Sequence, residues 1–465
     1  MFSLTKYTIR KINTLTFFTT LFCILLFYLP FQCRYTHLVK KIIYSVFSRD
    51  FDSFLKIDGS LCFYLTDFLM IGMVISSFFA QKLRTLFWEK SRKYLSLFLI
   101  ISLISILHSP HSHEPWAYYP YLFQLLIPSL FFYALSSHLQ IKEFVIRGFW
   151  IIFFSSIIEC LIAIAQYFVQ NPIGLDKLGE PFLFAIIGIA DKTRWIFDSF
   201  FHIKSLSNEI FRAAGTLPHP NILGCFIGFS LFISFFLYTL IQTKRNRALF
   251  TLALFLQCFT LFITYSRAAI LGLLLGSLFW FGFFLYKKQA NIKTLLIKIV
   301  ACIGLSALLL FPQLIERGGI INYSVCAKSS DQTRLIYQMR AVEKVKKHSL
   351  FGIGFHQYLV AMKEQNEKGD AVHNIYLLIA TESGLVGLAA FLCFLFSLIW
   401  HAMRNKLEPI SVTLIAILVF LLFIGGCHYD LIKSQQERLL FFLSCGLLVL
   451  YSQKAPAFTD IKKKQ

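Results

Sequence analysis

The chain has 465 residues, of which 57% are hydrophobic and only 15% are charged. Because a soluble globular domain is charged at about 25% of its positions, this composition excludes an ordinary soluble protein and predicts an all-α polytopic membrane protein. The net charge of +21 does not indicate a nucleic-acid partner, since no basic domain stands apart from the apolar segments.

Apolar segments recur along the whole chain. A helix needs roughly 20 apolar residues to cross a bilayer, and about twelve segments approach that length. They lie near residues 14–32, 60–80, 94–108, 116–137, 148–170, 220–241, 248–265, 268–286, 295–311, 374–400, 409–426 and 437–452. Together they predict a single integral membrane domain over residues 1–465. The first segment lacks a small-residue cleavage site, so we expect a retained helix rather than a signal peptide.

Short basic loops predict how these segments are oriented. If all twelve span the membrane, six basic clusters fall on one side: the start of the chain, residues 82–93, 244–247, 287–293 and 404–406, and the C-terminal IKKKQ. Lys and Arg favour cytoplasmic loops, so both termini are expected to be cytoplasmic. The basic residues of loop 33–58 disagree with this orientation.

The opposite, extracytoplasmic side then carries the two longest loops, residues 171–219 and 312–373. The first contains PFLFAIIGIA (181–190), which is too short to span and is expected to be re-entrant or interfacial. The second contains DQTRLIYQMRAVEKVKKH (331–348). Apolar side chains recur there at helical spacing opposite a basic face, which predicts an interfacial amphipathic helix; they are Leu335, Met339, Val342 and Val345.

Three polar groups also fall on the extracytoplasmic side. They are FRAAGTLPHPN (211–221) with Arg212 and His219, TYSRAAI (264–270) with Arg267, and AVHN (371–374) with His373 and Asn374. Each has a purely structural interpretation. An arginine near a membrane face is often a snorkelling anchor, HPN is typical of a helix start, and a lone histidine is often an interfacial residue.

The combination of these groups indicates chemistry that none indicates alone. Two forked guanidinium groups, on Arg212 and Arg267, suit a diphosphate, which presents several oxygens. The imidazole of His373 could accept a proton from an attacking hydroxyl. The pattern therefore predicts transfer of a group from a diphosphate leaving group to an alcohol at the outer face of a membrane.

Acidic residues within the apolar segments are interpreted structurally. Asp67, Glu159 and Glu382 would be costly in lipid, so each is expected to face the bundle interior and find a partner. Glu382 is expected to pin the packing of its helix, with Gly384 and Gly387 allowing close approach of a neighbouring helix.

Metal or nucleotide chemistry has little support. Asp50 and Asp52 have a spacing that some glycosyltransferases use for a divalent ion, but two carboxylates in a polar loop are more often simply solvated. No zinc-spaced His/Cys cluster, P-loop or dinucleotide motif is present in the sequence. Neither a metal nor a cofactor is predicted.

These motifs resemble those of the O-antigen ligase and polymerase superfamily, over roughly residues 150–450. The glycine-spaced pattern of His373, Asn374, Gly384 and Gly387 is similar to the ligase motif. SLFGIGFHQY (349–358) resembles the loop that precedes that motif in the family. RAAGTLPHPN and TYSRAA resemble the family's two arginine segments, and HYDLIKSQQERLLF (428–441) resembles a loop and helix start found in many members.

The resemblance implies a mechanism and a location. Arg212 and Arg267 would bind the diphosphate of an undecaprenyl-diphosphate-linked glycan. His373 would activate the acceptor hydroxyl, which in ligases belongs to a lipid A-core sugar. Attack at the anomeric carbon with inversion would release undecaprenyl diphosphate, without metal or nucleotide. The protein would lie among the lipids of the bacterial inner membrane, with its active site facing the periplasm.

The resemblance also implies further residues around the same cavity. Arg334 is similar to another loop arginine of the family. The remaining candidates for the cavity are His219, Asn374, His428, Tyr429 and Asp430. No arginine cluster can be assigned to the acceptor, so the acceptor stays open.

Two alternatives remain. A polymerase or a protein O-oligosaccharyltransferase of the same superfamily would share the donor chemistry and differ in the acceptor. A twelve-span secondary transporter would instead predict repeats and broken helices at the membrane midplane. No repeat is visible in the sequence, and the polar residues cluster at one face, so the transporter is the less favoured alternative.

Overall fold

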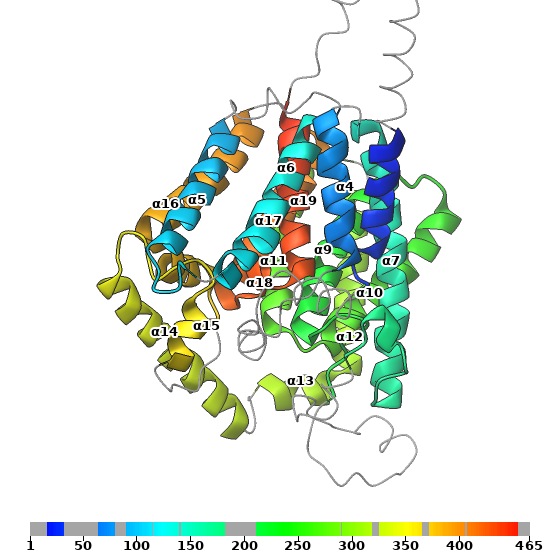
Figure 1. Ribbon diagram of the computed structural model, residues 1–465. Coiled ribbons are helices and arrows are strands. Elements are labelled where there is room, and N and C mark those ends of the chain that lie inside the picture. The colour runs from blue at the N-terminus through cyan, green and yellow to red at the C-terminus, as the bar shows by residue number, and fades with distance from the viewer. Residues whose placement is uncertain are drawn as a thin grey trace, which may run out of the picture.

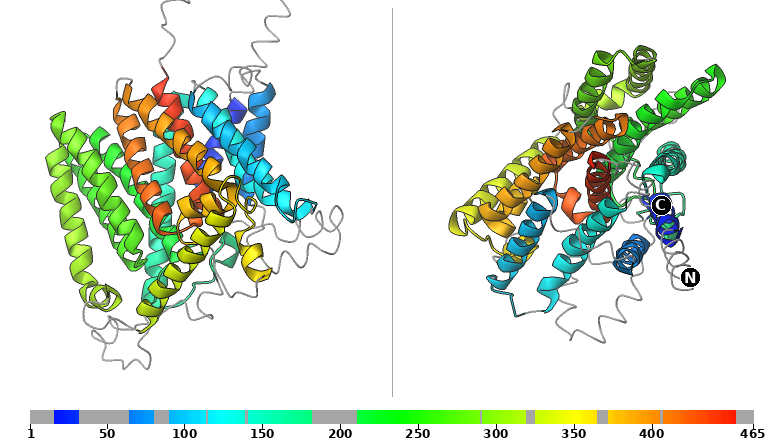
Figure 2. Two further views of the ribbon diagram at one scale, coloured as in Figure 1. Left: turned by 90° about the vertical axis from the view of Figure 1, so that its left-hand side faces the viewer. Right: turned by 90° about the horizontal axis from the view of Figure 1, so that it is seen from above.

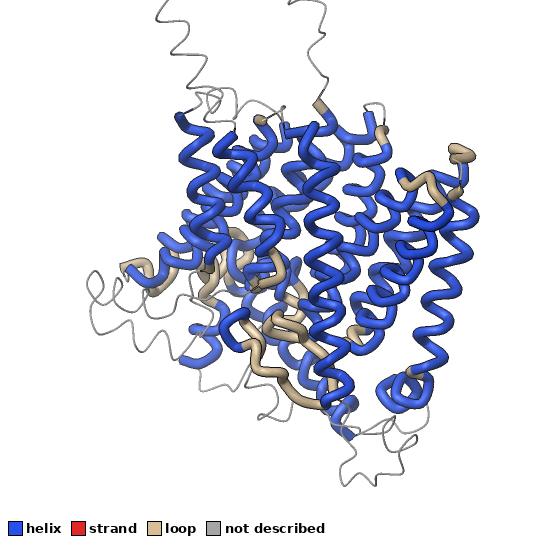
Figure 3. The backbone as a smooth tube through the Cα atoms, turned by 90° about the vertical axis from the view of Figure 1, so that its right-hand side faces the viewer, coloured by secondary structure: helices blue, strands red, loops and turns tan. Residues whose placement is uncertain are grey.

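The structure of the protein is a computed structural model. It describes residues 16–31, 64–79, 90–113, 115–138, 141–181, 211–289, 291–318, 325–364, 372–404 and 407–453. Within these ranges the fold consists of helices and connecting loops, and no strand is present (Figure 3). The predicted all-α class is therefore confirmed.

Each of the twelve predicted apolar segments contains a helix in the described part of the chain. In chain order they are Thr16–Tyr28, α4 (Leu65–Phe79), α5 (Lys90–Leu107), the π-helical turn η3 (Tyr121–Leu126) continued by α6 (Ile127–Ser137), α7 (Lys142–Val169), α9 (Pro220–Leu240), α10 (Lys244–Ile263), α11 (Arg267–Tyr286), α12 (Ile292–Leu309), α16 (Ile375–Arg404), α17 (Pro409–Cys427) and α19 (Gln435–Ser452). Seven of these are long and apolar enough to cross a membrane: α7, α9, α10, α11, α12, α16 and α17. The protein is therefore a polytopic helical membrane protein.

The helices form one bundle in which α9 is central (Figures 1 and 2). It packs against α7, α10, α11, α17 and α19. In α9, 94% of the apolar stretch is buried, against 28% in α12, which lies at the edge of the bundle. An apolar helix exposed in this way is suited to contact with lipid, because the hydrocarbon core is itself apolar.

Local sequence signals set the boundaries of the central helices. His219 caps α9 with Pro220 as its first residue, and the Thr243 side chain caps α10 by accepting a bond from Asn246 N. Short turns then connect α9, α10 and α11 in alternating directions. At one end of this unit Arg247 donates to Asn291 Oδ1 at 3.0 Å. At the other end Arg212 contacts Thr264, so the basic turns lie opposite the arginine segments.

The loop between α12 and α16 is helical in its described parts. It contains α13 (Phe311–Gly318), α14 (Val325–Lys347) and α15 (Tyr358–Glu364), which lie at one end of the bundle (Figure 1). The predicted helix over 331–348 is confirmed within α14. Its Ala341 is buried in a small core with Tyr358 and Leu378, whereas Leu335, Met339 and Val342 are exposed. These three predicted apolar side chains therefore do not pack into the bundle, and the location of α14 at a membrane interface stays a prediction.

Some predictions fall outside the described residues. The segment 181–190 has only its first residue within the described part, and Asp50 and Asp52 lie wholly outside it. The proposed re-entrant segment and the acidic pair therefore stay predictions.

Candidate active site

The loop that precedes α9 positions Arg212. Its Nε donates to Thr264 O at 2.8 Å, and its Nη2 donates to Asn221 Oδ1 at 2.7 Å. The backbone follows the same path, since Ala213 N donates to Ile263 O. These bonds fix the plane of the guanidinium between the start of α9 and the end of α10.

A buried polar network from α7 holds this loop in place. Glu159, fully buried, accepts a bond from Thr216 N at 3.0 Å and another from the Thr216 hydroxyl. Gln166 binds both polar groups of the Gly215 backbone, at 2.8 and 2.9 Å. Gly215 has a φ of +63°, and a Cβ at this position would overlap Glu159 Oε2. The tight turn before α9 therefore requires both the glycine and the glutamate.

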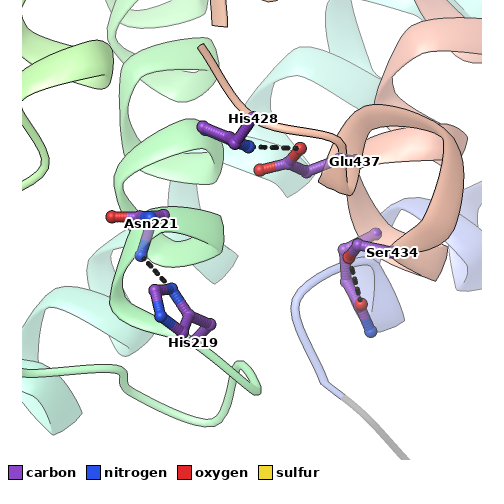
Figure 4. Close-up of polar contacts among 6 residues, drawn as sticks. His219, Asn221, His428, Ser434 and Glu437 are labelled. Carbon is purple, nitrogen blue, oxygen red and sulfur yellow. Dashed lines mark hydrogen bonds and ion pairs between the residues drawn. The ribbon is translucent and has the colours of Figure 1, made fainter. Parts of the chain in front are cut away.

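His219 and Asn221 are parts of the same helix start. His219 Nδ1 accepts a bond from Asn221 N at 3.0 Å (Figure 4). The Asn221 side chain in turn accepts the bond from Arg212 Nη2. The structural interpretation of HPN as a helix start is thus confirmed. Because Asn221 also accepts the bond from Arg212, the start of α9 holds that guanidinium in place as well.

Arg267 is the first residue of α11 and is exposed. It follows the turn Thr264–Ser266, whose Thr264 carbonyl receives Arg212. The two arginine segments therefore lie in contact at one end of the bundle. The bonded residues, Arg212 and Thr264, are 52 positions apart in the sequence. Gly224 makes the meeting possible, since a Cβ there would lie 3.0 Å from Ser266 Cβ and 3.1 Å from Ala269 Cβ.

Asn374 caps the helix that follows His373. Its Oδ1 accepts bonds from Tyr376 N at 2.9 Å and Leu377 N at 3.0 Å. The His373 ring meets the Tyr429 ring edge-on, with 5.3 Å between their centroids. Asn374 therefore fixes the start of α16, and Tyr429 provides one contact for the imidazole.

Behind His373, α16 is interrupted at Gly384, which has φ +71° and ψ 178°. The loop from Ser349 to Gly354 enters this break. Leu385 N donates to Ser349 O at 2.8 Å, Ile353 N to Thr381 O at 3.0 Å and Gly354 N to Glu382 O at 3.0 Å. A Cβ on Gly384 would overlap the Leu350 carbonyl. Gly384 does permit a close approach, but the partner is the backbone of the preceding loop and not another helix.

Three residues follow α17 in the predicted cavity. His428 is buried, with Nδ1 3.9 Å from Glu437 Oε2 at the start of α19 (Figure 4). The Tyr429 ring contacts the His373 ring, and Lys433 Nζ lies 5.5 Å from the centroid of the same tyrosine ring. Asp430 begins α18 (Asp430–Lys433).

Arg334 of α14 lies close enough to act electrostatically on Cys427, the last residue of α17. The candidates thus form two groups. One contains Arg212, Arg267 and His219, and the other contains His373 and Tyr429 with Arg334 near the end of α17. Helix α17 links the groups, since it packs along α9 and α11 and also contacts α16.

A further polar network was not predicted as part of the site. Asp67 accepts bonds from Tyr64 N at 2.9 Å and from Gln435 Nε2 at 2.5 Å. Arg438 in turn donates to the Gln435 side chain and to Ile432 O at 2.6 Å. The signal in the sequence was SQQER at the start of an apolar helix, where a buried Glu and Arg require partners. This network holds the turn that carries His428 and Tyr429.

Comparison with known proteins supports the resemblance over part of the chain. The family model described as O-antigen ligase matches residues 252–392. This match confirms the resemblance to the O-antigen ligase family. It spans Arg267, Arg334 and His373 and ends before α17, so Arg212 and the 428–430 turn lie beyond it. No curated protein matches the chain. The match supports a membrane enzyme of the O-antigen ligase or polymerase type.

Proposed function

We propose that this protein is a membrane glycosyltransferase of the O-antigen ligase type. It transfers a glycan from undecaprenyl diphosphate to a sugar hydroxyl of lipid A core, at the periplasmic face of the bacterial inner membrane. Both termini are cytoplasmic in this proposal. The single observation that supports it best is the bond from Arg212 to Thr264 O, because it unites the two arginine segments beside a helix of the family region.

The arginines act on the donor. A diphosphate has several oxygens and is best neutralised by forked guanidinium donors held in a fixed plane. The bonds from Arg212 to Thr264 and Asn221 supply that fixed plane, and Arg267 adds a second, exposed guanidinium from the next turn. Charge that develops on the leaving group would be stabilised without rearrangement of the protein.

His373 acts on the acceptor. It takes the proton of the acceptor hydroxyl as the oxygen attacks the anomeric carbon of the donor sugar. A new C–O bond forms, the bond from the anomeric carbon to the diphosphate oxygen breaks, and undecaprenyl diphosphate leaves with that electron pair. Attack opposite the leaving group inverts the anomeric centre. The edge-on contact with Tyr429 and the cap at Asn374 orient the imidazole for this step.

The alternative acceptors are a second glycan repeat unit and a protein. To separate them, the purified full-length protein is supplied with an undecaprenyl-diphosphate-linked glycan and offered lipid A core, a repeat unit and a pilin-like protein in turn. We expect glycosylation of lipid A core. Transfer to either of the other acceptors alone would identify a polymerase or a protein glycosyltransferase, and solute flux without any transfer would identify a transporter.

His373→Ala tests the base. Transfer is expected to fall by about 10²- to 10⁴-fold while the protein still inserts and folds. His401→Ala is the matched control, because His401 is an exposed histidine at the opposite end of α16. If His373→Ala transfers glycan at the wild-type rate, the assignment of the base is wrong.

A further inference from the structure

A small pocket lies near the candidate active site but involves none of its predicted residues. Its volume is about 220 Å³, and it opens between the end of α5, the end of α14 and the start of α15. Its polar lining consists of His108, His111, Lys344, His348 and Gln357. Since pockets for drug-sized ligands measure about 300–1,000 Å³, this one has room for a single small unit only.

The walls of the pocket are built by close backbone packing. Gly352 N donates to His348 O at 3.1 Å, and Gln357 N donates to Gly354 O at 3.1 Å. A Cβ on Gly354 would lie 2.7 Å from Ser109 Cβ, so the loop from α14 to α15 presses against the turn after α5. His108 stacks on Phe351, with ring centroids 5.5 Å apart. The pocket is therefore preformed.

The lining combines donors with one buried acceptor. An imidazole carries at least one N–H donor in either protonation state, and a lysine carries three donors and a positive charge. The Nδ1–H of His108 already donates to Ile104 O at 2.9 Å, so the donors that remain for a ligand are those of His111, His348 and Lys344. Among the described residues that line the pocket, none is acidic. Gln357 is only 2% exposed, and its Oε1 accepts no hydrogen bond within the described part of the chain. A buried acceptor without a donor is costly, so a ligand hydroxyl would be stabilised there.

We propose that this pocket binds one negatively charged sugar unit. The ammonium group of Lys344 and the N–H donors of His111 and His348 bind its phosphate or carboxylate, and Gln357 Oε1 accepts a hydrogen bond from one of its hydroxyls. A bare anion would satisfy only the first group, and a neutral sugar only the second.

The position of the pocket connects it with transfer. Helix α14 carries Lys344 at the pocket and Arg334 near the end of α17, ten residues apart, or about 15 Å along the helix axis. The pocket would thus hold a charged sugar unit of a glycan substrate at a distance from the reacting hydroxyl. This role rests on the proposed function, whereas binding itself does not.

The test measures binding of glucose 6-phosphate to the full-length protein in nanodiscs by ligand-observed NMR. Glucuronate presents a carboxylate, glucose lacks the charge, inorganic phosphate lacks the sugar, and glycerol 3-phosphate imitates a lipid headgroup. We expect glucose 6-phosphate and glucuronate to bind more tightly than the other three probes. Lys344→Ala should weaken glucose 6-phosphate binding by about ten- to a hundredfold, because a charge-assisted hydrogen bond is lost.

Two further variants sharpen the test. Gln357→Glu keeps the size of the side chain and adds a negative charge, so it should weaken binding of glucose 6-phosphate. Lys347→Ala removes an exposed lysine of the same helix that does not line the pocket, and it should leave binding unchanged. Equal binding to wild type and Lys344→Ala would overturn the proposal. Binding of glucose, phosphate or glycerol 3-phosphate as tight as that of glucose 6-phosphate would also overturn it.

The two proposals fail separately. His373→Ala should bind glucose 6-phosphate like the wild type, whatever its transfer rate. Normal transfer by that variant would contradict the catalytic assignment alone, and absent sugar-phosphate binding by the wild type would contradict the pocket alone.

Discussion

Glu159 and Glu382 are two buried glutamates that each fasten a loop of the candidate site to a long apolar helix, but by different means. Glu159 of α7 uses both side-chain oxygens, which accept the N–H and the hydroxyl of Thr216. Glu382 of α16 uses mainly its backbone carbonyl, which accepts bonds from Gly354 N and from Ser105. Its side chain accepts one longer bond, from Tyr358 N at 3.4 Å, and also interacts with the backbone of His356.

The difference shows which residue determines the position of each loop. On the arginine side, the loop depends on the chemistry of one side chain, so a change of that side chain should displace Arg212. On the histidine side, the loop depends on a helix that opens its backbone at Gly384. There the identity of the glycine matters more than that of the neighbouring glutamate.

Gly384→Ala should have the largest effect. The added methyl group would overlap the Leu350 carbonyl, and alanine is strained at a φ of +71°. We expect a loss of more than about 3 kcal/mol in the free energy of unfolding, because strain and overpacking combine. Thermal unfolding in detergent measures it.

Gly304→Ala is the control for this variant. Gly304 lies in α12, and an added Cβ would meet no atom within 4 Å. This change should leave stability unchanged or slightly increased, since alanine favours a helix. Similar losses in both variants would mean that the loop does not occupy the break in α16.

Glu159→Ala should have the next largest effect. It removes the acceptor for two buried donors of Thr216, which should cost about 2–3 kcal/mol of unfolding free energy. Transfer should fall further than stability alone explains, because Arg212 loses its fixed position. Glu159→Gln, which keeps one acceptor oxygen, should fall between the wild type and Glu159→Ala. Transfer at the wild-type rate by Glu159→Ala would separate this network from the arginine.

The sequence predicted the helices of this fold better than the contacts between them. Each of the twelve apolar segments contains a helix in the described part of the chain, and the cost of a buried charge correctly predicted partners for Asp67, Glu159 and Glu382. The partners themselves could not be predicted. Asp67 and Gln435 are 368 positions apart, and no local pattern marks such a contact. For Gly384, the sequence indicated close approach. A glycine in the sequence does not distinguish packing against a helix from packing against a loop backbone.

Glu382→Gln should have the smallest effect and tests the comparison most directly. The bonds from Gly354 and Ser105 reach the backbone carbonyl, which the substitution leaves in place, and Gln still offers an oxygen to Tyr358 N. We expect a change in unfolding free energy of less than about 1 kcal/mol and transfer close to the wild-type rate. A loss as large as that in Glu159→Ala would show that the carboxylate itself fastens the histidine loop. In that event the two glutamates would act alike, and the break at Gly384 would no longer account for the position of the loop by itself.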